Sequence, residues 1–334
     1  MTDTNTGQYF VELLESVSGL GISNPRAVRL ANAAWDSWEK QGVSRGKDTD
    51  DVIHQPHLIF KKYYLDIVKA NNLKNKNVHF CLARTKELNA YANTTKNGDY
   101  VVVFDSELYT FINDVIITCI VCVYSHPSDD EVDFYFSHVY DLFLQFKGFT
   151  IKKSSEEQGD DFVKIITKDY DLTMLGSYCG AAIYAFIICH ELGHHILGHT
   201  KKGKVKKAIF SENTEVSIGF NKTSIEEEFE ADEIGFHLYT NISKEYENLK
   251  DLKLNNQFIS VPLIFFKLLE ILNIIRKSSG ESHPEPNLRY MRLEQIKKTL
   301  NIEEDTEFYE ALMEVFSGLY KWVYEKSQLT NAST

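Results

Sequence analysis

Residues 172–194 read LTMLGSYCGAAIYAFIICHELGH, an uncharged run that leads directly into a motif of histidine and glutamate. The run from Leu172 to Cys189 approaches the ~20 apolar residues that a helix needs to span a bilayer. It contains two glycines, a serine and two tyrosines, and His190 and Glu191 follow it at once. This pattern favours a helix buried in a large core over a membrane span. We therefore expect a soluble, cytoplasmic protein with no membrane span.

The motif that ends this run is His190-Glu191-Leu192-Gly193-His194. On a helix, positions i and i+4 lie on one face, so the two histidines could bind one Zn²⁺ ion. Glu191 would then lie beside the metal, where its carboxylate could accept a proton from zinc-activated water. The alternative is a surface helix that is rich in His and Glu. The apolar residues before the motif argue against that alternative, because buried charges without a metal or a partner are costly.

A zinc site that hydrolyses peptides has three protein ligands and keeps a fourth position for water, so a third ligand must come from elsewhere. His199 lies nine residues after His190, whereas the metzincin pattern requires a histidine ten residues after the first. We therefore do not expect His199 to be a ligand. The acidic stretch Glu226–Glu233 offers Glu228 instead, and most other carboxylates of this stretch are expected on a solvated helix face.

Glu228 and Asp232 are i,i+4 neighbours, so they share one face of the helix expected in this region. Glu228 could bind the zinc ion as the third ligand. Asp232, one turn later, could accept the free N–H of a ligand histidine, which would fix the tautomer of that ring. The same stripe carries small residues that would let this helix approach another one closely: Ala231 and Gly235.

Two further segments accompany these motifs: N-A-Y-A at residues 89–92, with the run GDYVVV at 98–103, and S-H-P at 282–284, with Arg289 five residues after the proline. Together with H-E-x-x-H and E-x-x-A-D-x-x-G, they resemble the gluzincin metallopeptidases, most closely the group of the CAAX prenyl proteases and HtpX. The resemblance implies a zincin-like catalytic core with an active-site helix and a small antiparallel sheet. The Lit-type phage-exclusion peptidases resemble the chain more weakly, in size, solubility and H-E-x-x-H only.

The resemblance also implies roles for particular residues. His283 would stabilise the transition state by donating to the developing oxyanion, and Arg289 would support the helix that carries the metal ligand. The strand Tyr100–Phe104 would be the edge to which an extended substrate adds. The alternatives are that His283-Pro284 is the N-terminal turn of a helix and that Val101–Val103 is a core strand.

These observations favour a zinc-dependent endopeptidase that acts on a protein or peptide substrate. One Zn²⁺ ion would be held by His190, His194 and Glu228, and Glu191 would be the general base. Two other classes remain open. One is a non-catalytic, zinc-stabilised regulator or sensor that binds a partner through its N-terminal helices, and the other is a metal-independent helical structural protein.

The composition excludes other classes. The chain has 334 residues, of which 43% are hydrophobic and 25% charged, as in ordinary folded proteins. Its formal net charge of −12 argues against non-specific binding to nucleic acid or anionic lipid, because both require clustered Lys and Arg. The pair Cys119-x-x-Cys122 lies in an apolar run without a second pair, so we expect it to pack in the core rather than to bind metal.

Apolar periodicity predicts an α+β, mostly helical chain with three parts: a helical N-terminal region (residues 1–75), a catalytic domain (76–300) and a C-terminal helix (301–334). β-rich runs predict strands at Val78–Ala83 and Tyr100–Phe104. Helices are expected at Phe10–Lys40 (two helices), Leu58–Asn71, Val132–Phe146, from Leu172, from Ile225, Phe258–Arg276, Asn287–Leu300 and Thr306–Lys326.

Two local features add detail. The segment Gly148–Lys168 is expected to be an inserted hairpin or loop, because Ser154–Asp161 is polar. Ser224 is followed three residues later by Glu227, a spacing that predicts a capping box at the start of the helix from Ile225.

Overall fold

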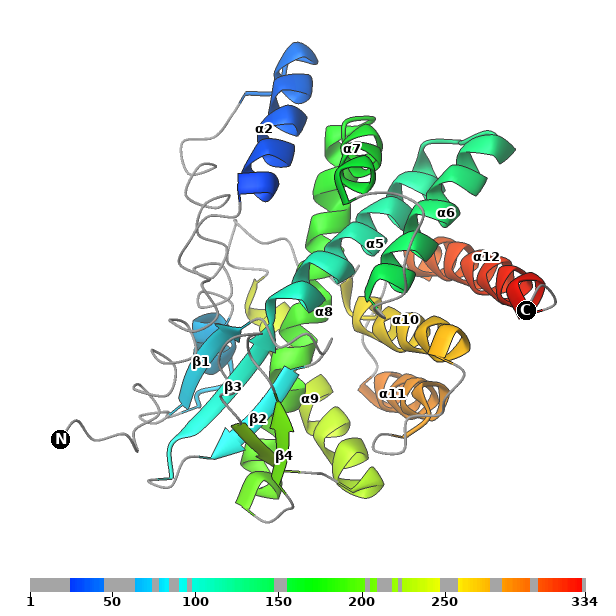
Figure 1. Ribbon diagram of the computed structural model, residues 1–334. Helices are drawn as coiled ribbons and strands as arrows, with labels where there is room; N and C mark the ends of the chain where they lie inside the picture. The colour runs from blue at the N-terminus through cyan, green and yellow to red at the C-terminus, as the bar shows by residue number, and fades with distance from the viewer. Residues whose placement is uncertain are drawn as a thin grey trace.

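The structure is a computed structural model that describes residues 25–44, 64–73, 78–83, 90–94, 98–146, 155–201, 205–208, 218–221, 224–246, 258–276, 284–300 and 306–331. Over these residues the chain is α+β and mostly helical, as the sequence predicts. The long helix α8 (Tyr170–Ile196) runs through the middle of the molecule, with a small sheet on one side and a group of helices on the other (Figure 1).

Most helices lie where apolar periodicity predicts them, with bounds that differ by a few residues. Residues 64–70 are helical as well, and the first helix expected within Phe10–Lys40 lies outside the described residues. The helices besides α8 are α2 (Pro25–Lys40), α5 (Ser106–Tyr124), α6 (Asp129–Phe146), α7 (Ser155–Ile166), α9 (Ile225–Tyr246), α10 (Val261–Arg276), α11 (Pro286–Leu300), α12 (Thr306–Asn331) and the 3₁₀ turn η1 (His199–Lys201).

Helix α8 is the core helix that the uncharged run predicts. Its N-terminus is capped by Asp169, whose side chain accepts the N–H of Leu172 at 3.0 Å. Among the described helices it is the one long and apolar enough to cross a membrane, and 72% of its most apolar window is buried inside the protein. Such burial is typical of a central helix in a hydrophobic core.

The expected core packing of the C-x-x-C pair is confirmed. Cys119 and Cys122 are buried free thiols on α5. Burial raises the pKa of the Cys119 thiol well above its ordinary value and that of Cys122 to about 11, so both remain protonated at neutral pH. Protonated, buried thiols behave as small apolar side chains.

The main sheet is mixed rather than wholly antiparallel. Its strands are β1 (Val78–Ala83), β2 (Ala90–Thr94) and β3 (Tyr100–Asp105), in the order β1-β3-β2. β3 is parallel to β1 and antiparallel to β2, so it is the central strand and the expectation that Tyr100–Phe104 forms the edge is wrong. The physical reason is visible in the sequence YVVVF, which is apolar at consecutive positions and suits a strand buried on both faces.

A second, two-stranded antiparallel sheet joins β4 (Val205–Ala208) to β5 (Ile218–Asn221). It lies in the segment between the two helices that carry the candidate metal ligands. β5 is close to β2 and to η1. The lower part of Figure 1 shows this hairpin beside the main sheet.

The expectation of a hairpin or loop over Gly148–Lys168 is wrong for its second half, which forms helix α7. The helix buries polar side chains, including Gln158 and Asp161, and its apolar residues come only in the last turns. Hydrophobic periodicity therefore misses it. α7 also contacts α2, where the indole N–H of Trp38 donates to the carbonyl of Ile166 at 3.1 Å.

One hydrophobic cluster joins the three parts expected from the sequence. It contains Trp38 of α2, Phe186 of α8 and Phe316 of α12.

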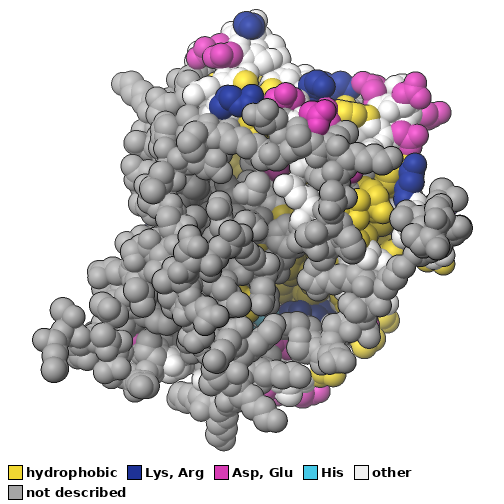
Figure 2. Space-filling view, viewed as in Figure 1, with side chains coloured by type: hydrophobic (Ala, Val, Ile, Leu, Met, Phe, Trp, Pro, Cys, Tyr) yellow, Lys and Arg dark blue, Asp and Glu magenta, His cyan; other side chains and the backbone are white. Residues whose placement is uncertain are grey.

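The surface is charged by comparison: Figure 2 shows acidic side chains gathered at the upper right, over the region where α6 begins. The first turn of α6 carries three acidic residues, Asp129, Asp130 and Glu131, where carboxylates interact favourably with the helix dipole.

Candidate metal centre

The site lies where α8 and α9 cross, and glycines allow the two helices to come very close. A Cβ atom added to Gly235 of α9 would lie 2.7 Å from the Cα of His190, and one added to Gly193 of α8 would lie 2.8 Å from the carbonyl oxygen of Ala231. Both distances are shorter than a real Cβ contact. Small side chains on this stripe therefore permit the close approach, as expected from the sequence.

Helix α9 is fixed at its start by the predicted capping box. The Ser224 N–H donates to the carboxylate of Glu227 at 2.7 Å, and the Glu227 N–H donates to the Ser224 hydroxyl at 3.2 Å. Such a box satisfies two of the backbone donors that a helix start leaves free. It sets the first turn of α9, and Glu228 comes one residue later.

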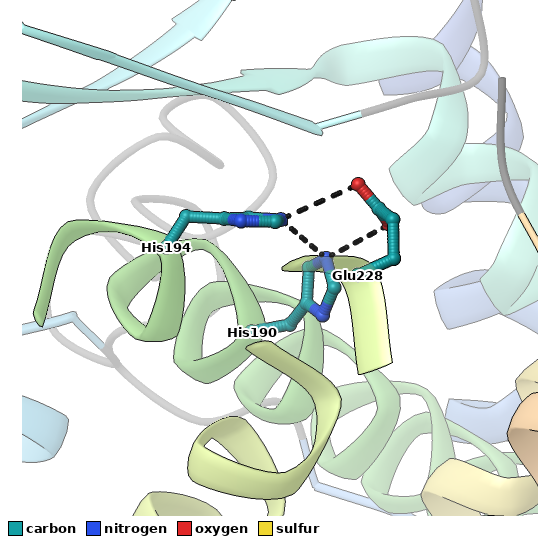
Figure 3. Close-up of side chains that lie close together, drawn as sticks. All are labelled: His190, His194 and Glu228. Carbon is teal, nitrogen blue, oxygen red and sulfur yellow. Dashed lines mark hydrogen bonds and ion pairs between the residues drawn. The ribbon is translucent and has the colours of Figure 1, made fainter. Parts of the chain in front are cut away.

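Three donor atoms converge between the helices: the Nε2 atoms of His190 and His194 from α8 and the carboxylate of Glu228 from α9 (Figure 3). The two Nε2 atoms lie 3.1 Å apart. The Glu228 oxygens lie 3.6 Å from Nε2 of His190 and 3.5 Å from Nε2 of His194. All three residues are buried, and this His-His-Glu group could hold a metal ion.

Behind the donors, Asp232 and Arg289 form a buried ion pair. Arg289 donates through Nε and Nη2 to the two oxygens of Asp232, at 2.7 and 2.6 Å, and its Nη1 lies 3.7 Å from a Glu228 oxygen. On its other side, Asp232 lies 2.9 Å from Nδ1 of His190, a close polar contact whose alignment is short of an ideal hydrogen bond. Arg289 of α11 is thus connected through Asp232 to a candidate ligand.

The pKa values of the pair follow from these contacts. Burial alone would raise the pKa of Asp232, but the charge and hydrogen bonds of Arg289, aided by His190, hold it below its ordinary value. Burial likewise lowers the pKa of Arg289, and the charge of Asp232 more than reverses this. Both groups are therefore charged at neutral pH, which makes each partner necessary to the other.

The donor set suits a cation. With the His190 proton on Nδ1, toward Asp232, the Nε2 atom presents a lone pair to the centre of the cluster. Burial lowers the pKa of His194, but its hydrogen bond to Glu228 and the charges of Glu191 and Glu228 outweigh this and raise it. The surroundings thus favour positive charge at this point, and either a proton or a metal ion can supply it.

Glu191 is buried on α8, next to the candidate ligand His190. Its charge raises the pKa values of His194 and Arg289, so its carboxylate lies within electrostatic reach of the cluster. The backbone at this point is held by β3: the hydroxyl of Tyr100 donates to the Glu191 carbonyl, and the Tyr100 ring stacks on His195 with centroids 3.8 Å apart. Burial and then the Glu191 charge raise the pKa of Tyr100, which keeps this donor protonated.

The structure brings together most of the residues singled out from the sequence, namely His190, Glu191, His194, Glu228, Asp232 and Arg289. His283 lies outside the described residues, so its role stays a prediction. Sequence reasoning missed two residues at the edge of the cluster: His199, which contacts His194, and Glu230, which contacts His199. It considered His199 only as a ligand, and Glu230 only as part of the solvated face.

The candidate site is defined by these contacts alone, without support from a related protein. Comparison with protein-family models, curated proteins and solved structures finds no match to this chain.

Proposed function

We propose that the protein is a zinc-dependent endopeptidase of the gluzincin type. The observation that carries the proposal is the buried convergence of His190, His194 and Glu228, with the Asp232–Arg289 pair behind it. Two imidazoles and a carboxylate form the donor set of peptidase zinc sites that keep a position for water. The sequence resemblance to gluzincins supports the same assignment and adds the general base.

The residues of the site would have three roles: metal ligand, orienting group and general base. His190, His194 and Glu228 hold the ion, and Asp232 and Arg289 keep His190 oriented. The ion, when bound, would act as a Lewis acid that lowers the pKa of water, so that water can give up a proton and attack a peptide carbonyl at neutral pH. Glu191, on the helix turn that carries His190, accepts the proton of the attacking water and returns it to the leaving amine.

Substitution of the general base tests this proposal. Glu191→Gln removes the proton acceptor and leaves the three ligands in place, so the variant should retain its metal ion. Cleavage should fall by about 10²–10⁴-fold, the usual contribution of a positioned acid–base group. The measurement is N-terminal labelling of the proteome in cells that express the wild type or the variant.

A matched control is Glu233→Gln on α9, a half-exposed carboxylate that pairs with Arg292 at 3.5 Å and lies outside the donor set. It should cleave like the wild type. Full proteolysis by Glu191→Gln would contradict the mechanism. A wild-type protein that binds metal yet produces no new N-termini would favour the non-catalytic regulator.

A further inference from the structure

His199 is a buried histidine, 8% exposed, that directly contacts a candidate metal ligand. Leu197 caps the C-terminus of α8, and Gly198, at a φ of +75°, turns the chain so that η1 folds back on α8. This places Nδ1 of His199 3.1 Å from Nδ1 of His194. On its other side, Nε2 of His199 lies 3.1 Å from a carboxylate oxygen of Glu230 on α9.

The turn that carries His199 is itself held in place. The hydroxyl of Thr200, the next residue, lies 2.7 Å from the hydroxyl of Thr94 on β2, so a hydrogen bond joins η1 to the sheet. Thr200 is also buried. His199 is thus fixed from both its backbone and its ring, as a positioning group must be.

The protons of this chain of contacts can be assigned in only one way that leaves a metal-binding atom free. His194 faces the donor cluster through Nε2, so its proton must be on Nδ1. Nδ1 of His199 must then be the acceptor, and the proton of His199 lies on Nε2, where it is donated to Glu230. If His199 instead donated from Nδ1 to His194, the proton of His194 would have to lie on Nε2, and that atom could no longer bind a metal ion.

We propose that His199 and Glu230 are positioning residues for His194, and the proposal rests on the metal binding proposed above. The Glu230 carboxylate fixes the tautomer of His199, and His199 in turn holds the His194 ring with its Nε2 lone pair toward Glu228. The two ligand histidines are therefore supported differently. His190 contacts a buried aspartate directly, whereas His194 reaches a half-exposed glutamate through a second imidazole.

Zinc affinity of the full-length protein, measured by competition with a chromophoric chelator at fixed pH, tests the proposal. Loss of a group that orients a ligand histidine typically costs 10–100-fold in metal affinity. We expect a loss of about this size for His199→Ala and a smaller, several-fold loss for Glu230→Ala. His199→Asn should recover much of the affinity, because the amide oxygen can accept the His194 proton, and a merely structural role would not produce that recovery.

Glu226→Ala is the matched control, since Glu226 is an exposed carboxylate of the same helix that faces Arg292 instead. It should bind zinc like the wild type. Imidazole nitrogen shifts measured by NMR should show the proton of His199 on Nε2. Glu230 is 49% exposed, so its variant keeps the test available if His199→Ala fails to fold.

Wild-type affinity in His199→Ala, or equal losses in His199→Ala and His199→Asn with both folded, would overturn the positioning role alone. A proton found on Nδ1 of His199 would do the same. A wild-type protein without measurable zinc affinity would overturn this inference together with the proposed function.

Discussion

The two halves of α8 use the same packing device for different purposes. In the N-terminal half, Gly176 lies against the backbone of Ile117 on α5, inside the apolar core. In the C-terminal half, Gly193 lies against α9, which carries the buried carboxylates of Glu228 and Asp232. The first contact buries apolar surface and stabilises the fold. The second uses the same closeness to gather charged and donor groups away from water, which is useful only if a partner or an ion neutralises them.

Among these predictions, removal of Arg289, which pairs with Asp232 at the contact between α8 and α9, should cause the largest loss of stability. Arg289→Met leaves Asp232 buried without its counter-charge, and breaking such a pair costs about 3–5 kcal/mol. Denaturant unfolding of the metal-free protein measures this loss. The control is Arg292→Met, one turn along α11, where the 3.5 Å pair with Glu233 is partly exposed and should contribute at most ~1 kcal/mol. Equal losses in the two variants would contradict the structural role of the Asp232–Arg289 pair.

Adding one methyl group at each of the two helix contacts should distinguish their roles, because only the contact with α9 should affect metal affinity. Gly235→Ala forces α9 away from His190 and should lower both metal affinity and stability, the latter by about 1–3 kcal/mol. Gly176→Ala meets the α5 backbone at 2.7 Å and should cost similar stability while metal affinity is kept.

The control for both glycine variants is Gly318→Ala on α12. The added Cβ would lie 3.5 Å from the Phe136 ring, an ordinary contact, so the variant should be neutral or stabilised by up to ~1 kcal/mol. Thermal unfolding and chelator competition on the same samples provide both readouts. Metal affinity that falls equally in Gly176→Ala and Gly235→Ala would show that the halves are not separable.

The smallest effect concerns an exposed ion pair outside the two helix contacts, between Glu131 of α6 and Lys168, which lies just before α8. The hydrogen bond from Lys168, followed by those from the Ser128 N–H and hydroxyl, lowers the pKa of Glu131 to about 2. Because the folded pKa is depressed, this stabilisation is present above the unfolded value of about 4.3 and is lost as the pH falls toward 2. Glu131→Gln should therefore slightly flatten the acid side of the stability profile, and salt should weaken the wild-type effect. An unchanged profile would show that the exposed pair is fully screened.

The sequence predicts most of the described helices, because the face that each of them buries carries apolar residues at helical spacing. The uncharged run before His190 could only be a core helix or a membrane span, and its glycines and tyrosines favoured the first. The facing pair of Glu228 and Asp232 also follows from helical spacing alone. α7 could not be found in this way, since Gln158 and Asp161 interrupt the apolar face that it buries.

Long-range pairings were beyond sequence reasoning for a different reason. The apolar run of β3 suits a strand buried on both faces, but no local pattern specifies that β1 joins it in parallel. The contact between His194 and His199 depends on the turn at Gly198, which brings the chain back onto α8. Spacing rules tested His199 only as a ligand, and they contain no pattern for a histidine that supports another histidine.

The central claim is that His190, His194 and Glu228 hold one zinc ion, and metal content measures it most directly. Elemental analysis of the purified, dialysed full-length protein should find about one zinc per chain in the wild type and in Glu191→Gln. His194→Ala and Glu228→Ala, each lacking one donor, should retain less than about a tenth of that amount under the same dialysis. A wild-type protein without stoichiometric metal, or variants that retain it in full, would contradict the account.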